Sequence, residues 1–215
     1  MHPLFFYRGV VAVTAMSFSI LAAAQTKQEA VPVKVGDTWS YSVKNVLEPA
    51  KSQNLQTTAV EVNGNRWTGK VVGSLTGESS FERSQDWQVY KTVSPSSTRE
   101  FKPSAQEFGF PLEAGKTFKS EGSFTNASGF VVVQRYEGKV IGTEKITVGA
   151  DTLEAWIIES NGWWNSGNQS GRLSTKVWYS PQARAMVKVE FKRANAKGQP
   201  DENTLTEMTA FKLVD

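Results

Sequence analysis

The sequence predicts an all-β protein with a single domain, formed by a strongly curved antiparallel sheet or an incomplete β-barrel. Val187, Val189 and Phe191 alternate with charged residues, which is the period-2 pattern of a half-buried strand. Asn63-Gly64-Asn65 separates two such strands, and Asn-Gly accepts the positive φ of a tight hairpin turn. After residue 24, no helical periodicity continues for more than about two turns.

Residues 1–24 have the three parts of a secretory signal peptide. Arg8 gives a basic start, an apolar run follows over residues 10–21, and three alanines precede Gln25, the expected mature N-terminus. The apolar run is shorter than the roughly 20 residues that a membrane-spanning helix needs. The chain contains no cysteine, so no lipid can be attached to one. We therefore expect a soluble, non-lipidated bacterial protein of the periplasm, or a secreted one, with no transmembrane segment after cleavage.

The remaining chain, residues 25–215, is expected to form one all-β domain. Turn residues separate segments rich in aromatic and β-branched side chains, which favour strands. Strands are expected at residues 38–46, 55–62, 66–72, 87–93, 130–148, 153–160, 174–179, 187–192 and 205–213. Gly149-Ala150-Asp151 is expected to form a second hairpin turn.

These strands also suggest two duplicated β-repeats, at about residues 33–103 and 110–213. The sequence V-G-D-T-W at residues 35–39 matches A-G-K-T-F at residues 114–118. The hairpin at residue 64 then matches the hairpin at residue 149. Each half would close with a strand containing a tryptophan, Trp87 in the first and Trp178 in the second. Two unrelated all-β segments could also align this well.

The stretch W-Y-S-P-Q-A-R-A-M-V-K-V-E at residues 178–190, with V-G-A-D-T-L-E-A-W-I-I-E upstream and G-W-W between them, carries a family resemblance. It resembles an uncharacterised family of exported bacterial proteins whose sheets are related to the lipoprotein-localisation factors. This resemblance covers about residues 116–213. It implies a curved antiparallel half-barrel that holds acyl chains, and no catalytic residues. Unlike those factors, this chain shows no amphipathic helix that could cover the barrel mouth.

Trp178, Tyr179 and Arg184 are candidate ligand-binding residues within this stretch. Pro181 fits the second position of a turn because its φ is already fixed. In one interpretation the three residues form an aromatic and basic rim for an anionic head group. In the other they belong to a well-made hairpin with Trp178 in the core.

Two further candidates, Trp163 and Trp164, lie among Asn, Gly and Ser residues, which favour a surface turn. The other five tryptophans fall in expected strands, where core packing is the usual role. Neighbours on a strand point to opposite faces. We therefore expect one ring of the pair inside and the other outside, available to a lipid, a sugar or a protein partner.

Several kinds of chemistry are excluded or disfavoured. The only histidine is His2, within the expected signal peptide, so the mature protein lacks both cysteine and histidine for nucleophilic catalysis or zinc sites. No cofactor, metal or nucleic-acid partner is expected, because no motif for one is present and the 24 basic and 21 acidic residues are well mixed. A carboxylate pair is the remaining catalytic option, with candidates Glu78, Glu82, Asp86, Glu154 and Glu159.

The leading hypothesis is a noncatalytic periplasmic binding protein for a hydrophobic or amphipathic envelope component. The alternative is a protein-interaction or assembly module of the cell envelope without a small ligand. A carbohydrate-active enzyme using two carboxylates is the third and weakest reading.

Overall fold

The computed structural model describes residues 27–215, so the expected signal peptide and Gln25 lie outside the described part of the chain. Residues 27–215 form twelve β-strands and one short 3-10 helix, η1 (Pro49–Lys51). The strands are β1 (Thr38–Asn45), β2 (Gln53–Asn63), β3 (Arg66–Gly73), β4 (Gly77–Ser84), β5 (Gln88–Ser94), β6 (Ser97–Gln106), β7 (Thr117–Thr125), β8 (Val131–Val148), β9 (Asp151–Ser166), β10 (Gln169–Ser180), β11 (Ala185–Asn195) and β12 (Pro200–Lys212). The all-β prediction is confirmed. Within this range no helix has the length and apolar character needed to cross a membrane.

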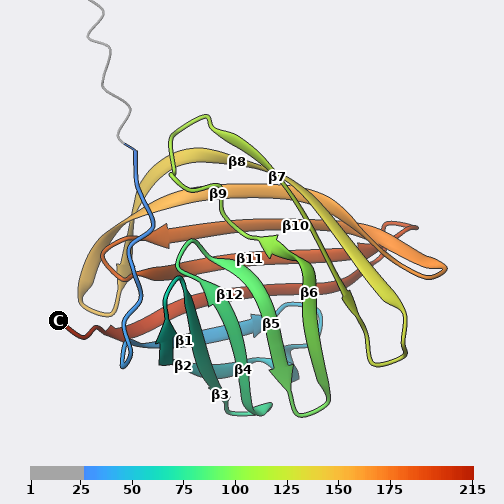
Figure 1. The fold of residues 1–215 in the computed structure, drawn as a ribbon, viewed down its shortest axis with the longest axis horizontal. Helices are drawn as coiled ribbons and strands as arrows, with labels where there is room; N and C mark the ends of the chain where they lie inside the picture. Colours follow the sequence, from blue (N-terminus) through green and yellow to red (C-terminus); the bar gives the residue numbers. More distant parts are fainter. Residues whose placement is uncertain (1–26) are drawn as a thin grey trace, which may run out of the picture.

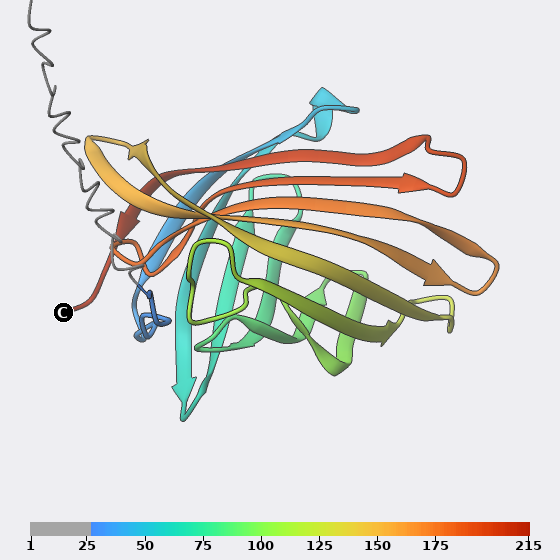
Figure 2. The ribbon, with the colours of Figure 1, turned by 90° about the horizontal axis from the view of Figure 1, so that it is seen from above.

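All twelve strands belong to one antiparallel sheet with the order β6-β5-β4-β3-β2-β1-β12-β11-β10-β9-β8-β7. Two six-stranded meanders, β1–β6 and β7–β12, therefore meet where β1 pairs with β12. Figure 1 shows the long strands β8–β12 crossing β3–β6 at a steep angle, and Figure 2 shows the two groups as opposite walls of the curved sheet. The sheet thus forms a nearly closed barrel.

The single open seam lies between β6 and β7, which are consecutive in the chain and form the two edges of the sheet. Side chains join the edges instead of a backbone ladder. The backbone N–H of Gln106 donates to the Ser120 hydroxyl at 2.9 Å, and the rings of Phe101 and Phe124 are 5.1 Å apart. Pro103 on β6 has no backbone N–H to donate, which suits an unpaired edge.

One end of the barrel is closed by two irregular segments, residues 27–37 and the β6–β7 connection. They are joined by backbone hydrogen bonds between Gln28 and Leu112 at 2.9 and 2.8 Å. Val33, Phe108 and Leu112 are buried there in the main core. In addition, the backbone N–H of Val33 donates to the Gln85 side chain at 2.8 Å. The core is therefore concentrated at this closed end.

The two halves begin with turns of the same geometry. Gly36 and Gly115 both have positive φ, 95° and 85°, which glycine adopts without steric cost. The N–H of Gly36 donates to the carbonyl of Ala59, and the N–H of Gly115 donates to that of Val140, each at 2.8 Å. The matched sequences at residues 35–39 and 114–118 thus adopt matched structures, while the evolutionary duplication stays a prediction.

The strand predictions fail in three places. Three strands, β4, β6 and β7, were not among the expected ranges. The β4 sequence G-E-S-S-F-E-R-S and the β7 sequence T-F-K-S-E-G-S-F-T are rich in polar residues, and Pro103 interrupts β6. Residues 161–166, expected as part of a surface turn, continue β9, and only Gly167 and Asn168 form the turn. The halves end with β6 and β12 rather than with tryptophan-containing strands, and Trp87 precedes β5 by one residue.

Candidate functional site

The barrel interior holds a partly open cavity of about 530 Å³ that is lined by residues of both halves. Its apolar wall includes Trp67 and Phe81 from the first half and Val177 and Val189 from the second. Small-ligand sites in proteins occupy roughly 300–1,000 Å³. The diameter of a barrel grows with its number of strands: eight strands can hold one small ligand, and porins with 16 or more leave a channel. A barrel of twelve strands is therefore wide enough for an interior ligand site.

The strand register assigns each side chain to the cavity or to the outer face. Residues directly opposite one another in an antiparallel pair share a face. Ser160 lies opposite Thr175, Thr175 lies opposite Phe191, and all three line the cavity. Ser174, the neighbour of Thr175, therefore faces outward.

An aromatic floor closes the cavity toward the core. The ring centroid of Trp67 lies 6.0 Å from Trp39, 4.9 Å from Phe81 and 5.7 Å from Trp87. The indole N–H of Trp39 donates to the carbonyl of Ala183 at 2.8 Å. The indole N–H of Trp67 donates to the carbonyl of Ser84 at 3.2 Å. Because the rings pack against one another and two of the indoles are held by hydrogen bonds, they form a preorganised apolar surface.

A half-buried ion pair lies in the wall beside this floor. The guanidinium of Arg83 pairs with the carboxylate of Glu107 and also lies 4.8 Å from the ring centroid of Phe81 and 5.1 Å from that of Trp87. All four residues line the cavity. Within residues 27–215, the Nε of Arg83 is buried without a hydrogen-bond partner. Sequence reasoning missed this pair, although the spacing of Phe81 and Arg83 places both on one face of a strand.

Two tyrosines add hydroxyl groups to the same cavity. Burial raises the pKa of Tyr41 well above the usual value, although the nearby charge of Arg83 acts in the opposite direction. Burial likewise raises the pKa of Tyr136, and the carboxylate of Glu107 raises it further. Both side chains therefore keep their protons at neutral pH and can donate and accept hydrogen bonds.

The structure places Trp163 and Trp164 on opposite faces of β9, as expected from strand alternation. Trp164 lies opposite Gln134, which lines the cavity, and the Arg193 guanidinium is 5.7 Å from its ring centroid. Trp163 is 42% exposed and lies on the outer face opposite Arg135. Only one ring of the pair is thus open to solvent on the outside.

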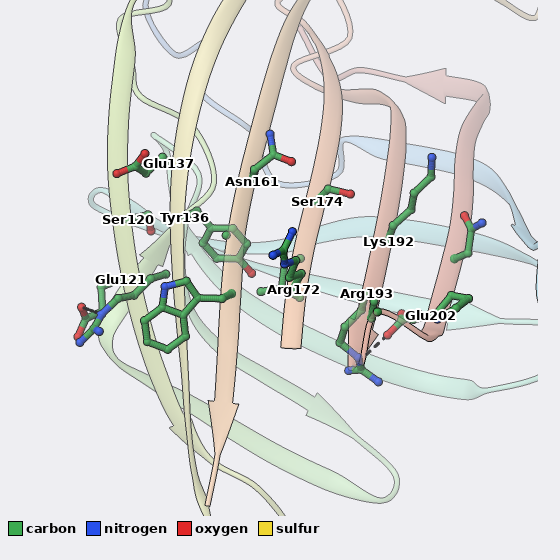
Figure 3. A pocket seen from close by; sticks show the side chains of 18 of the residues that line it. Ser120, Glu121, Tyr136, Glu137, Asn161, Arg172, Ser174, Lys192, Arg193 and Glu202 are labelled. Atoms are coloured by element: carbon green, nitrogen blue, oxygen red, sulfur yellow. Dashed lines mark hydrogen bonds and ion pairs between the residues drawn. The ribbon is translucent and has the colours of Figure 1, made fainter. Parts of the chain in front are cut away.

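Trp163 belongs to an outer groove of about 950 Å³ that crosses β7–β12, and Tyr136 and Glu202 border both this groove and the cavity. The Arg135 guanidinium lies 5.0 Å from the Trp163 ring centroid and is paired with Glu121. Figure 3 shows Glu121, Glu137, Asn161, Ser174 and Lys192 on neighbouring strands along this groove. The groove therefore combines one exposed indole with mixed charges.

Trp178 and Tyr179, two of the candidates from the second-half hairpin, are buried in the core. The indole N–H of Trp178 donates to Glu144, and the ammonium of Lys188 lies 4.7 Å from its ring centroid. The hydroxyl of Tyr179 accepts a hydrogen bond from the backbone N–H of Val31 at 3.2 Å. Neither residue lines the barrel cavity or the outer groove.

Arg184, the third of these candidates, is held by internal contacts at the closed end. Its guanidinium donates to both carboxylate oxygens of Asp37, at 3.1 and 3.2 Å, and to the carbonyl of Val214 at 3.0 Å. The structure does not bring Arg184, Trp178 and Tyr179 together with the Trp163–Trp164 pair. These contacts match the well-made hairpin in the core rather than a rim at the cavity mouth.

Several of the candidate catalytic carboxylates form ordinary ion pairs. Glu82 lies 2.7 Å from Arg66, Glu78 lies 2.7 Å from Lys70, and Glu159 lies 2.9 Å from Lys176. Asp86 accepts a hydrogen bond from the hydroxyl of Ser84, and Glu154 is exposed. Among residues 27–215, no group of three or more Asp, Glu, His or Cys side chains is arranged to hold a metal ion.

Solved structures share this fold at low sequence identity. A candidate lipoprotein from Parabacteroides distasonis superposes with a TM-score of 0.55 and 11% identity, over 87% of this chain and 100% of the other. A candidate exported protein with YmcC-like fold from Bacteroides fragilis gives 0.53 and 9%, over 86% and 99%. The hypothetical lipoprotein YmcC from Escherichia coli gives 0.50 and 6%, over 83% and 86%.

No protein-family model and no curated protein sequence matches the chain. The similarity to the three solved structures covers most of each molecule, and their names agree with the expected resemblance to exported bacterial proteins. The relationship to lipoprotein-localisation factors stays a prediction. At these identities the similarity concerns the fold, and this chain has the fold of YmcC-like proteins.

Proposed function

We propose that this protein is a noncatalytic binding protein of the bacterial cell envelope that holds a hydrophobic or amphipathic molecule inside its barrel. The observation that carries the proposal is the cavity of about 530 Å³ with an aromatic floor and polar groups in its wall. Burial of apolar surface would drive binding, at roughly 25 cal/mol for each Å² removed from water. The polar wall would orient the ligand.

The envelope location rests on two observations. The neighbours in fold are candidate exported proteins or lipoproteins, and residues 1–24 have the pattern of a signal peptide. Unlike a lipoprotein, this chain contains no cysteine. The proposed protein is therefore a soluble periplasmic or secreted carrier or receptor.

A pair of neighbouring substitutions tests the interior site. Thr175→Trp would place an indole in the cavity, whereas the control Ser174→Trp would place the same group on the outer face. Native mass spectrometry with mono-oleoylglycerol should detect a one-to-one complex for the wild type and Ser174→Trp but a much weaker one for Thr175→Trp. A folded Thr175→Trp variant that binds as the wild type does, or a wild type that binds nothing, would contradict the proposal.

The outer groove supports a second candidate function, a docking surface for an envelope protein. Trp163 is exposed, and the guanidinium of Arg135 lies over its ring. Tryptophan and arginine are both enriched at protein interfaces. In a pull-down from envelope extract, a partner that is lost with Trp163→Ala but kept with Thr175→Trp would support this candidate. Capture that is equal for both variants would argue against it.

A further inference from the structure

The wall of the barrel cavity carries a compact set of polar groups that packing alone does not require. Tyr41, Arg83, Glu107 and Tyr136 come from three strands and the β6–β7 connection, and all line the cavity. Within the described part of the chain, neither tyrosine hydroxyl forms a hydrogen bond with another residue. Neither hydroxyl belongs to the fully buried side-chain atoms without a partner in this range, so both face the open part of the cavity and are available to a ligand.

The charges in this wall are already compensated. Arg83 pairs with Glu107, and its guanidinium lies against the rings of Phe81 and Trp87. Glu202, which also lines the cavity, pairs with Arg193 at 3.5 Å. A ligand carboxylate would therefore lie beside Glu107 without an unpaired cation, and like charges at such short range repel one another.

An uncharged head group meets no such penalty. The neutral hydroxyls of Tyr41 and Tyr136 can each donate to, and accept from, a ligand hydroxyl or ester oxygen. The carboxylate of Glu107 uses one oxygen, Oε2, for Arg83, which leaves Oε1 able to accept from a ligand hydroxyl. The wall thus offers donors and acceptors together, with no net charge from the Arg83–Glu107 pair.

We propose that the cavity selects amphiphiles with an uncharged, hydroxyl- or ester-bearing head group over amphiphiles with the same chain and an anionic head. The proposal rests on the proposed function of the interior as a binding site. The apolar chain lies on the aromatic floor, and the head group lies among Tyr41, Glu107 and Tyr136.

The first test compares two ligands that share an acyl chain, mono-oleoylglycerol and oleate, by titration calorimetry at pH 7.5. Both are kept below the concentrations at which they aggregate. We expect mono-oleoylglycerol to bind at least about tenfold more tightly, a difference of about 1.4 kcal/mol. Equal or tighter binding of oleate would overturn the selectivity while leaving the interior site intact, whereas failure of both to bind would contradict the proposed function itself.

The second test reverses the selectivity through Glu107. Glu107→Gln keeps the side-chain shape but leaves Arg83 as an uncompensated cation in the wall, so oleate should gain about tenfold or more in affinity relative to mono-oleoylglycerol. The matched control is Glu121→Gln, which removes the partner of Arg135 on the outer face and should leave the ratio unchanged. A folded Glu107→Gln variant with the wild-type ratio would overturn the proposal. If that variant does not fold, the comparison of the two ligands on the wild type decides.

Discussion

Asp37 binds Arg184 across 147 residues of sequence, with the Arg184 Nη1 atom 3.1 and 3.2 Å from the two carboxylate oxygens. The same carboxylate accepts the backbone N–H of Lys34 at 2.9 Å and that of Val214 at 2.8 Å. Asp37 is fully buried. The carboxylate therefore joins the start of β1, the β10–β11 turn and the C-terminal segment at the closed end of the barrel.

Replacing Asp37 by Ala should destabilise the protein by about 3–5 kcal/mol, because the change leaves the charge of Arg184 and two amides without their partner. Urea denaturation measures this loss. The control is Glu48→Ala, which removes an exposed partner of Lys51 at 2.7 Å and should cost no more than about 1 kcal/mol. Equal losses for the two variants would show that Asp37 does not hold the closed end together.

The two adjacent tryptophans should differ in their contribution to stability. Trp163 is exposed on the outer face, so Trp163→Ala should cost less than about 1 kcal/mol. Trp164 lies on the inner face with its indole nitrogen buried, and Trp164→Ala should cost about 1–3 kcal/mol, below the full penalty of a core tryptophan. Chemical denaturation of both variants checks the order, and a larger loss for Trp163→Ala would contradict the assignment of faces.

Stability should fall at alkaline pH because buried tyrosines resist ionisation. Burial raises the pKa of Tyr179 to about 12, although the hydrogen bond from Val31 acts in the opposite direction. An unfolded tyrosine ionises near pH 10. The contribution of Tyr179 is thus complete below about pH 10 and is lost as pH rises from about 10 to 12, by about 2–3 kcal/mol.

The control for this effect is Tyr179→Phe, which has no ionisable group at this position. The variant loses the acceptor for the Val31 N–H at every pH, so its stability starts lower, but it should fall less steeply between pH 10 and 12. Denaturation midpoints measured at half-unit intervals give both slopes. Parallel curves for the wild type and the variant would assign the alkaline loss to other residues.

The sequence predicted the fold class because most strands alternate clearly and because Asn-Gly and Gly-containing turns separate them. It did not predict β4, β6 and β7, because polar residues in β4 and β7 and Pro103 in β6 hide the alternation. Nor could it predict that β6 and β7 would form the seam, since this depends on the pairing of β1 with β12. Pairing between strands so distant in sequence leaves no local signal.

The candidate site was predicted only in part. Strand alternation correctly indicated that Trp163 and Trp164 face opposite ways, although their surface-turn composition concealed the long strand β9. Trp178, Tyr179 and Arg184 were candidates because of the motif in which they lie. In the structure Trp178 and Tyr179 pack in the core, and Arg184 binds Asp37 at the closed end of the barrel. Arg83 and Glu107 come together through two strand pairings, because Arg83 lies opposite Val89 and Val89 lies opposite Ala105. Glu107 itself lies in the irregular connection after β6, where strand alternation gives no signal.

The central claim, that the barrel interior takes an amphiphile, is tested most directly by fluorescence quenching with a monoacylglycerol whose acyl chain carries bromine. Trp39, Trp67 and Trp87 line the cavity, so a bound brominated chain would lie beside them. We predict saturable quenching at about one ligand per protein that persists in the Trp163→Phe variant, which lacks the exposed indole of the outer face. Absence of quenching, or its loss in the Trp163→Phe variant, would contradict the interior site and leave the outer face as the surface to pursue.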